Sequence, residues 1–434
     1  MKLPLKWLKD YVDYNVTHEE FANRMLLRGF EVAEIIPEMP GIKNVYVCTI
    51  TGIEQHPNAE RLRICDVDVG REEPLKIVTN ATNVTVGCQV PVALDGAVLA
   101  DGMEIKPTKM RGVMSYGMFC GGAELGITDA EYEGASNDSV LILNEQHENG
   151  QRIQEALDLD DVVFNIELTP NRPDCQSIIG ICREAASALG QKFHEPVIEA
   201  ITGEGDASDY ASVTILNPEL CPRYCARVVT DLKIEPSPRW MQQRLRLVGL
   251  RPINNIVDIT NYIMMAYGQP LHCFDADMIK GQRIVVKTLP EGTPFVTLDG
   301  EEHKLSERDL AICNAEEPMC IAGVFGGKGS GTYEGTTNVV LESAYVHPTW
   351  IRKSARRHGL STDASFRFER GIDPDGQIYA LKQAAMLVKE LAGGTISMEI
   401  KDVEAEGLAK AFPVNIRYAQ VNELIGKEIP AATV

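Results

Sequence analysis

Short alternating segments separated by turn residues dominate the stretch between residues 41 and 126. Four of them cover Val45–Ile53, Leu62–Val69, Leu75–Thr79 and Gln89–Leu94. Strands this short, with turn signals roughly ten residues apart, are typical of a small barrel. The pattern therefore predicts a five-stranded barrel of the OB type, a fold that binds oligonucleotides across its open face.

Helical segments flank this stretch and place the predicted barrel inside another unit. Residues 17–29 have helical spacing, with Thr17 as the N-cap, Glu20 completing a capping box and Gly29 as the stop. Apolar residues recur at helical spacing again over 178–189. We place both helices in one N-terminal unit, so that the barrel is an insertion.

A second large domain is predicted after a linker at 203–209 that is rich in Gly and Asp. A helix at 237–249 opens this domain, apolar or alternating segments predict a mixed sheet, and helices at 348–358 and 374–391 close it. Several domains are expected in any case, because single hydrophobic cores stop growing near about 250–300 residues.

The expected fold class is multidomain α+β, with an OB-type β-barrel inserted in an N-terminal α/β unit and a mixed α+β domain after it. The expected boundaries are 1–40 with 150–200 for the scaffold unit, 41–149 for the barrel, 209–399 for the second domain and 405–434 for the truncated start of a further domain.

The charge balance argues against non-specific binding to nucleic acid, so no DNA partner is expected. The chain has 42 Lys and Arg against 62 Asp and Glu, a formal net charge of −20, whereas non-specific binding depends on neutralising phosphates. RNA contact must therefore come from local patches, although each patch could instead be a solvated face. One patch lies at 352–370, and the other comprises Arg61, Arg63, Lys76, Lys106, Lys109 and Arg111.

Cysteine usage and hydropathy point to the cytoplasm. The 11 cysteines are scattered without paired CxxC sets, so no metal site is predicted and the thiols are expected to be reduced. No apolar run is long enough to cross a bilayer, and no charged-then-apolar leader follows Met1. We expect a cytoplasmic protein without a membrane partner.

Polar residues interrupt the second domain at 251–262 with 269–272, at 322–327, and at Glu342 with 361–365. So many polar side chains among apolar ones are costly to bury unless they are paired or functional, and a polar pocket is the simplest explanation. Taken singly, each signal has a plainer interpretation. His272 could be a satisfied core histidine, Glu342 a salt-bridged strand end, and Gly326-Gly327 a tight turn.

Several motifs, taken in order, make the chain resemble one family, the β subunits of bacterial phenylalanyl-tRNA synthetases. The resemblance covers essentially every residue of the chain and corresponds to the N-terminal half or more of such a subunit. One departure is Thr79–Val84, which replaces an expected Cys-Gly-Ala-Pro-Asn-Val-like turn. The motifs that carry the resemblance are Trp7–Val12, His56–Leu62, Thr169–Asp174 with Arg183-Glu184, Val257–Tyr262, Gln269–His272, and Thr362–Ser365 with Glu369–Gly371.

The resemblance implies that the barrel binds tRNA, and we assign this to Arg61, Arg63, Lys109 and Arg111. It also implies that the second domain is an editing module that hydrolyses mischarged Tyr-tRNA(Phe). A pocket shaped for phenylalanine cannot strongly reject an isostere that adds a hydroxyl, so a second site that binds this hydroxyl restores fidelity.

The family's editing pocket carries over onto seven residues of this chain. Glu342 is expected to receive the tyrosine hydroxyl, His272 to place a water or the terminal adenosine, and Thr362 with backbone N–H groups near Gly326 to stabilise the oxyanion. Arg251 is expected to hold a phosphate. The expected catalytic residues are His272, Thr362 and Gly326, and the expected substrate-binding residues are Arg251, Asn261, Glu342 and Ala364.

The same resemblance implies partners that lie outside this chain. The full enzyme would be an α2β2 tetramer that uses ATP and Mg²⁺, with amino-acid activation and aminoacylation in the α subunit. No cofactor is expected within this chain, and tRNA(Phe) is its expected nucleic-acid partner.

Two other classes of function remain open at this point. One is a non-catalytic tRNA-binding and assembly subunit, in which the polar residues form a satisfied structural network. The other is an unrelated small-molecule hydrolase, which would not need a basic barrel. An open cavity lined by His272, Glu342 and Thr362 would favour hydrolysis, and a closed network would favour the assembly subunit.

Overall fold

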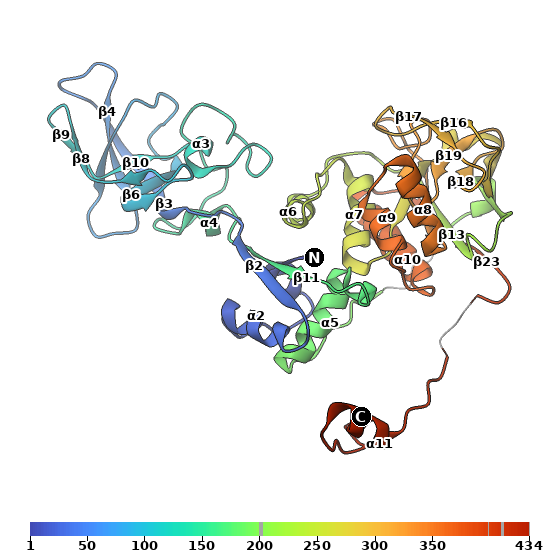
Figure 1. The fold of residues 1–434 in the computed structure, drawn as a ribbon. Coiled ribbons are helices and arrows are strands. Elements are labelled where there is room, and N and C mark those ends of the chain that lie inside the picture. The colour runs from blue at the N-terminus through green and yellow to red at the C-terminus, as the bar shows by residue number, and fades with distance from the viewer. Residues whose placement is uncertain (199–202, 398, 409–411, 434) are drawn as a thin grey trace. The chain divides into compact units, whose positions relative to one another are not determined.

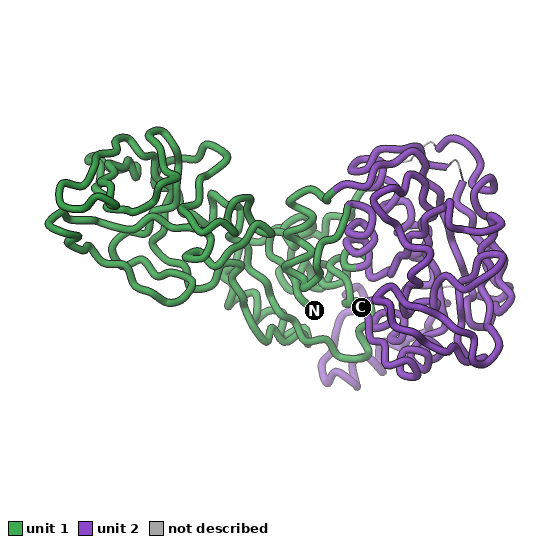
Figure 2. The backbone as a smooth tube through the Cα atoms, turned by 90° about the horizontal axis from the view of Figure 1, so that it is seen from above, with its two compact units in different colours: residues 1–197, 236–254, 265–267 green, residues 198–235, 255–264, 268–434 purple. Residues whose placement is uncertain are grey.

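A computed structural model describes residues 1–198, 203–397, 399–408 and 412–433. The chain divides into two compact units (Figure 2). Unit 1 contains residues 1–197, 236–254 and 265–267, and unit 2 contains residues 198–235, 255–264 and 268–434. The predicted linker at 203–209 carries a short 3-10 helix at Ala207–Asp209.

The N-terminal scaffold of unit 1 is a three-stranded antiparallel sheet with helices. β11 (Val162–Glu167) lies between β1 (Lys2–Pro4) and β2 (Glu31–Pro37). Residues from both sides of the barrel therefore pair in one sheet, which confirms that the barrel is an insertion. The helices of this scaffold are α1 (Leu5–Lys9), α2 (His18–Leu26), α5 (Ile178–Leu189) and the short helix at Pro173–Cys175.

Helix ends in the scaffold follow from their capping residues. The Thr17 hydroxyl accepts the Glu20 backbone N–H at 3.2 Å and starts α2, whereas the Glu20 side chain pairs with Arg24 instead of completing a capping box. The Ser177 hydroxyl accepts the Gly180 N–H at 3.0 Å and starts α5. Gly190 ends α5 in the left-handed conformation, which glycine adopts without strain.

The inserted region is a strongly curled sheet of the OB type, as predicted (Figure 1). Its strand order is β10-β6-β3-β4-β5, with β7 paired to β6 and a separate β8–β9 hairpin. Alternating residues such as Val47, Ile50 and Val92 are buried inside it. The elements are β3 (Lys43–Gln55), β4 (Arg63–Asp68), β5 (Leu75–Thr79), β6 (Gln89–Val98), β7 (Glu104–Ile105), β8 (Thr108–Met110), β9 (Val113–Ser115), β10 (Gly117–Phe119), α3 (Gly122–Leu125) and α4 (Ile153–Ala156).

Unit 2 contains two sheets with an apolar core that draws on both of them. The first has the order β14-β21-β13-β22, with β23 also paired to β13, and the second has the order β12-β15-β18-β19-β20. Tyr224, Phe274 and Val340 of the first sheet share this core with Ile312 and Ile321 of the second. The strands of the first sheet are β13 (Arg223–Thr230), β14 (Leu271–Asp275), β21 (Val339–Tyr345), β22 (Thr395–Ile396) and β23 (Lys401–Glu404).

The second sheet of unit 2 carries a small ribbon at one side. Its strands are β12 (Ser212–Ile215), β15 (Arg283–Thr288), β18 (Leu310–Cys313), β19 (Pro318–Ile321) and β20 (Phe325–Gly326), and the ribbon pairs β16 (Thr293–Val296) with β17 (Glu302–Leu305). Short 3-10 helices at Ala276–Met278 and Lys280–Gln282 precede β15.

Four helices accompany these sheets: α7 (Asn255–Tyr267), α8 (Pro348–His358), α9 (Asp363–Phe368) and α10 (Gly376–Ala392). Helix α10 packs on β13 and β21, and its buried residues lie outside the core shared by the two sheets. The side of β13 and β21 that bears Tyr224 and Val340 therefore faces the second sheet, and the other side faces α10.

Helix α6 (Arg239–Val248) is present as predicted, but it belongs to unit 1 rather than opening unit 2. Arg244 pairs with Asp10 at 2.7 Å, and its guanidinium lies 5.3 Å from the Trp7 ring centroid. Gln243 donates to the Glu38 carboxylate at 2.9 Å. Helical periodicity predicts the helix, but it does not say which unit the helix packs against.

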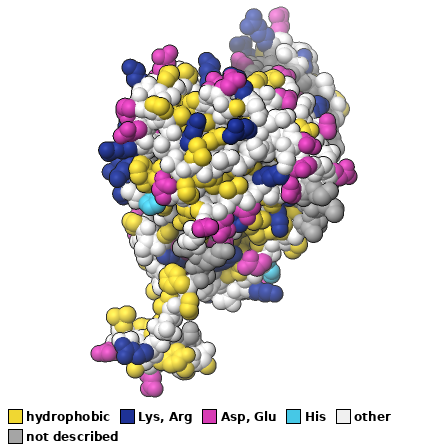
Figure 3. Space-filling model, turned by 90° about the vertical axis from the view of Figure 1, so that its right-hand side faces the viewer, with side chains coloured by type: hydrophobic (Ala, Val, Ile, Leu, Met, Phe, Trp, Pro, Cys, Tyr) yellow, Lys and Arg dark blue, Asp and Glu magenta, His cyan; other side chains and the backbone are white. Residues whose placement is uncertain are grey.

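At the C-terminal side, α11 (Tyr418–Ile425) has no buried residue. No helix among the described residues combines the length and apolarity needed to cross a membrane. On the face drawn in Figure 3, acidic and basic side chains are interspersed rather than gathered into one field.

Candidate functional site

The register of the first sheet in unit 2 brings His272 and Glu342 opposite each other. β14 and β21 are antiparallel, and His272 on β14 pairs directly with Glu342 on β21. On the other side of β21, Ala226 of β13 is the partner of Glu342. Directly opposed residues point to the same side of a sheet, and here this side faces the core between the two sheets.

Glu342 is a buried carboxyl group that forms no ion pair with another described residue. The residue is 6% exposed, and its Oε2 atom has no hydrogen-bond partner among the described residues. Burial raises the pKa of this carboxyl from 4.5 to about 8, and the neighbouring Tyr224 hydroxyl lowers the pKa only in part. Glu342 is therefore mostly protonated at neutral pH, when it can donate as well as accept a hydrogen bond.

His272 is held in a neutral form beside it. Its Nε2 atom is buried and has no partner within the described part of the chain. Burial lowers the pKa of the imidazole to about 4, and the ring packs edge-on against Phe274, with ring centroids 4.5 Å apart. A neutral imidazole can accept one hydrogen bond and donate another, which suits the positioning of a water molecule.

Gly326 on β20 lets the second sheet approach this histidine. A Cβ atom at this position would lie 2.9 Å from His272 Cε1 and 2.9 Å from Leu298 Cδ1. Only glycine gives the ring this space. The Gly326 carbonyl accepts the Leu298 N–H at 3.0 Å, and the next N–H, that of Gly327, already donates to Met319.

Thr362 caps α9, and its hydroxyl is already engaged. It accepts the Ser365 backbone N–H at 3.0 Å and donates to the Val324 carbonyl at 3.0 Å. This arrangement leaves the Thr362 hydroxyl no proton for an oxyanion. Instead, Thr362 ties α9 to the turn that precedes Gly326. Ala364, also on α9, is half-buried against the core of unit 2.

The two remaining predicted pocket residues lie elsewhere in the chain. Asn261 is half-buried on α7 in unit 2 and is not part of the β14–β21 pairing that joins His272 to Glu342. Arg251 is exposed and belongs to unit 1. The structure therefore brings together His272, Glu342 and Gly326 directly, and it connects Thr362 to them through Val324.

Sequence reasoning missed Tyr224 and Leu298. Tyr224 is fully buried on β13, and its hydroxyl faces Glu342 without a partner of its own among the described residues. Leu298 follows β16 and contacts the Gly326 position. No local motif marks either residue, because their roles depend on strand pairing between distant segments.

In the barrel, His56 explains why a His-Pro-Asn motif precedes the basic residues. Its Nδ1 accepts the Asn58 backbone N–H at 3.0 Å, which assigns the ring proton to Nε2, and Nε2 donates to the Met110 carbonyl at 3.1 Å. The Asn58 side chain donates to the Arg111 carbonyl at 3.2 Å. These bonds tie the loop at 56–62 to the β8–β9 hairpin.

This tie gathers the predicted tRNA-binding residues. Arg61, Lys109 and Arg111 are exposed and Arg63 is half-buried. None of the four forms an ion pair with another residue that the structure describes. By contrast, Lys76 of the same sequence patch pairs with Asp66 at 2.8 Å and Lys106 pairs with Glu104 at 3.3 Å. These four predicted residues are thus the basic residues of the patch that have no ion-pair partner among the described residues.

A groove of about 820 Å³ lies in the barrel region. Its lining includes residues 79–83, the loop that departs from the family's motif, and Met103–Lys106. Thr108 and Met110 of β8 also line it. The loop that departs from the family's motif at Thr79–Val84 therefore lines the same groove as the β8–β9 hairpin, which carries Lys109 and Arg111 and is called the basic hairpin below.

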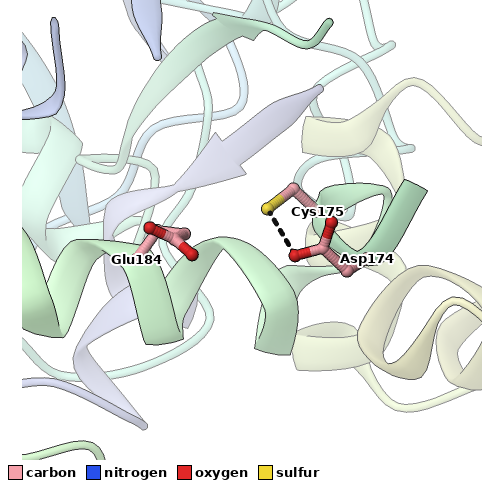
Figure 4. Close-up of side chains that lie close together, drawn as sticks. All are labelled: Asp174, Cys175 and Glu184. Atoms are coloured by element: carbon pink, nitrogen blue, oxygen red, sulfur yellow. Dashed lines mark hydrogen bonds between the residues drawn. The ribbon is translucent and has the colours of Figure 1, made fainter. Parts of the chain in front are cut away.

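A cluster of potential metal ligands, Asp174, Cys175 and Glu184, lies in the scaffold (Figure 4). The Arg172 guanidinium already occupies it. This group donates to the Asp174 carboxylate at 3.0 and 2.7 Å and to Glu184 at 2.6 Å. Because one cation already satisfies these carboxylates, the cluster does not fit a metal ion. The motif at 169–174 instead fixes the loop before α5.

Comparison with known proteins gives the class to which this arrangement belongs. A tRNA binding domain matches residues 45–152, which contain the basic hairpin. A B3/4 domain matches residues 220–393, which contain His272, Gly326, Glu342 and Thr362. The chain is thus a protein that joins a tRNA-binding domain to a B3/4 domain.

Whole-length relatives then give the family. The phenylalanine–tRNA ligase beta subunit of Bacteroides fragilis is 49% identical over 446 residues, covering 100% of this chain and 53% of the relative. That of Syntrophus aciditrophicus is 44% identical, again covering 100% and 53%. The chain belongs to the family of phenylalanine–tRNA ligase beta subunits, and it spans about half the length of the relatives it matches.

A solved N-terminal fragment of the phenylalanyl-tRNA synthetase beta subunit from Pyrococcus horikoshii is a weaker match. It shares 16% identity with a TM-score of 0.30, covering 67% of this chain and 77% of that chain.

Proposed function

We propose that this chain binds tRNA(Phe) through its barrel and hydrolyses wrongly attached tyrosine at the His272–Glu342 site. The observation that carries the proposal is the pair of buried, unpartnered polar atoms, Glu342 Oε2 and His272 Nε2, on opposed residues of one sheet. Native proteins rarely leave such atoms unpaired, and each costs about 1–3 kcal/mol unless a ligand or water uses it.

The electrostatics of the pair suit discrimination of a hydroxyl. Glu342 is a polar group in an apolar surrounding formed by residues such as Ala226 and Val340, so an added phenol oxygen gains a hydrogen bond there and a plain phenyl ring does not. A site built to bind a hydroxyl leaves its own polar group unpaired when the hydroxyl is missing. This is the selectivity that an editing site needs.

The remaining residues receive supporting roles in the proposal. His272 positions the attacking water or the terminal adenosine. Gly326 gives the imidazole its space, and Thr362 fixes the neighbouring turn through Val324. Asn261 and Ala364 stay proposed substrate contacts, and Arg251 a proposed phosphate contact.

The domain roles follow from the same assignment. We assign tRNA binding to residues 41–149, editing to 209–399, a scaffold to 1–40 with 150–200, and the start of a further domain to 405–434. In the full assembly, we propose an α2β2 tetramer in the cytoplasm, in which the α subunit activates the amino acid with ATP and Mg²⁺. We do not propose aminoacylation by this chain alone.

The alternative is a non-catalytic assembly subunit whose polar residues form a structural network. Such a network is expected to be fully satisfied, because half-satisfied buried networks are costly. The Asp309 cluster of unit 2, in which Ser354 and His358 both contact the carboxylate, meets that expectation. The unpartnered atoms at His272 and Glu342 do not, and this supports hydrolysis over the alternative.

The test is deacylation of Tyr-tRNA(Phe) and Phe-tRNA(Phe) by the purified 434-residue chain. We expect preferential release of tyrosine, a loss of this preference in Glu342→Ala, and slower release of both amino acids in His272→Ala. Glu390→Ala, an exposed glutamate on α10, is the matched control and should behave as wild type. Equal hydrolysis of both esters by the folded wild-type chain would refute the proposal.

A further inference from the structure

Tyr224 lies next to Glu342 on the side of the sheet that faces the second sheet. In the β13–β21 pair, Ala226 is opposite Glu342 and Tyr224 is opposite Ala344. Tyr224 and Glu342 are therefore diagonal neighbours on one side of two adjacent strands, a spacing that aromatic and long side chains bridge. The next two residues of the strand on this side, Ala226 and Val228, are apolar.

The Tyr224 hydroxyl is buried without a conventional partner. The residue is 0% exposed, and its Oη atom has no hydrogen bond to another described residue. Buried tyrosines ordinarily pair their hydroxyl, because an unpaired one costs about 1–3 kcal/mol. Tyr224 Oη and Glu342 Oε2 are both atoms of this kind, and the two side chains interact with each other.

The other titratable groups around Glu342 cannot serve as its donor. The Cys221 thiol donates to the Arg223 carbonyl at 3.4 Å, and the Cys320 thiol donates to the Phe325 carbonyl at 3.3 Å. The His272 ring approaches from β14, and its Nε2 atom makes no hydrogen bond to another described residue. Within the described residues, this leaves the Tyr224 hydroxyl as the donor that faces the carboxyl group.

We propose that Tyr224 is a positioning residue that sets the orientation of Glu342 for reading a phenolic hydroxyl. When substrate is bound, its hydroxyl donates to one carboxyl oxygen and leaves the second oxygen to the substrate. The inference rests on the proposed function and deepens it. A carboxyl group free to rotate would present either oxygen to the ligand, and discrimination between tyrosyl and phenylalanyl esters would fall.

The first test is Tyr224→Phe in the full 434-residue chain, which removes one oxygen and keeps the ring. We expect the ratio of Tyr-tRNA(Phe) to Phe-tRNA(Phe) deacylation to fall about tenfold, the equivalent of one hydrogen bond of about 1.4 kcal/mol. In Glu342→Gln, the added Tyr224→Phe should have little further effect, because the two groups act together. Tyr345→Phe is the control, since Tyr345 lies on the opposite side of β21 and its variant should keep the wild-type ratio.

The second test does not depend on activity. The protonated Glu342 carboxyl gives an infrared carbonyl band that is absent in Glu342→Gln. Because the Tyr224 hydroxyl lowers the pKa of Glu342, its removal should move the midpoint of this band to higher pH. An unmoved midpoint together with an unchanged ester ratio would overturn the role of Tyr224. If the wild-type chain hydrolyses Tyr-tRNA(Phe) and Phe-tRNA(Phe) equally well, the proposed function is refuted, whatever the infrared band shows.

Discussion

Unit 2 buries two carboxyl groups in opposite ways. Asp309 is 0% exposed, and it accepts hydrogen bonds from the Ser354 hydroxyl at 2.6 Å and the Ser306 backbone N–H at 2.8 Å, with His358 Nε2 at 2.7 Å and Arg357 also paired to it. Burial alone would raise the pKa of Asp309, but these partners lower it. Glu342 is almost as deeply buried, lacks such partners, and has a raised pKa.

The difference separates a structural carboxylate from one held for a ligand. At Asp309, one ionised group joins two elements of the fold, the segment before β18 and helix α8. At Glu342, the fold keeps a polar group unpaired at a cost in stability, which is expected where binding chemistry needs it. Burial alone does not distinguish the two, whereas the count of partners does.

The largest predicted effect is on stability and concerns Asp309, the structural carboxylate. Asp309→Ala should destabilise the chain by about 3–5 kcal/mol, because it leaves His358 and Arg357 without their shared counter-charge. Urea denaturation measures this directly. Asp309→Asn should recover part of the loss. A change below about 1 kcal/mol would mean that the cluster does not hold α8 in place.

A second prediction concerns stability against pH at Glu342. A pKa raised from 4.5 to about 8 means that stability is fully present below pH 4.5 and is lost as pH rises towards 8. Glu342→Gln removes this loss. As the pH rises from 5.5 to 7.5, the free energy of unfolding of the variant should therefore increase by about 3 kcal/mol relative to that of the wild type, at about 1.4 kcal/mol per pH unit. Denaturation curves at both pH values test it.

His272 changes the stability of the fold with pH in the opposite direction to Glu342, and a comparison of variants separates the two contributions. Its pKa is lowered from 6.5 to about 4, so its contribution to stability is present above pH 6.5 and is lost as pH falls towards 4. Comparing Glu342→Gln with wild type cancels the histidine, which both contain. A pH-independent difference between the two proteins would show that Glu342 is ionised in the fold.

A third prediction tests the close approach at Gly326. Gly326→Ala places a Cβ atom 2.9 Å from the His272 ring and should displace it, which would lower tyrosyl ester hydrolysis by tenfold or more. The expected loss of stability is smaller, about 1–3 kcal/mol. Gly329→Ala is the matched control, since nothing lies within 4 Å of its Cβ position. Full activity in Gly326→Ala would contradict the proposed role of His272.

The smallest predicted effect concerns the surface of the barrel, where a charged group with an ion-pair partner can again be compared with one that has none. Lys109 has no ion pair with another described residue, whereas the Lys106 charge is already paired with Glu104 at 3.3 Å. Lys109→Ala should weaken tRNA binding a few-fold. It should also reduce the slope of the logarithm of the binding constant against the logarithm of the salt concentration by about one, because one fewer counterion is released on binding. Lys106→Ala should have less effect. Filter binding at two salt concentrations compares them, and equal effects would remove the distinction.

Local signals in the sequence predicted much of the fold correctly. The α8 bounds Pro348–His358 match the prediction, because proline at the start and Gly359 after the end mark a helix without tertiary information. The strands of the barrel were predicted for a similar reason, since turn residues separate short alternating runs. The Thr17 cap is confirmed by its bond to the Glu20 N–H.

Signals that depend on partners were not available to sequence reasoning. Residues 255–262, interpreted as pocket lining because they are polar, begin α7. Asn255 donates to the Lys233 carbonyl and Thr260 donates to Val257, so these polar groups are satisfied by backbone. The contact of Tyr224 with Glu342 needs the β13–β21 register, which no local pattern contains.

The pairing of Pro37 with Val162 has a consequence for how the scaffold sheet tolerates the barrel. To the scaffold sheet, the whole barrel is one long hairpin connection between neighbouring strands. Loop-closure entropy grows only with the logarithm of loop length, and a folded loop whose ends meet adds little to it. The barrel therefore behaves as a cassette, which recombination could insert or exchange at this hairpin without redesigning the sheet that carries it.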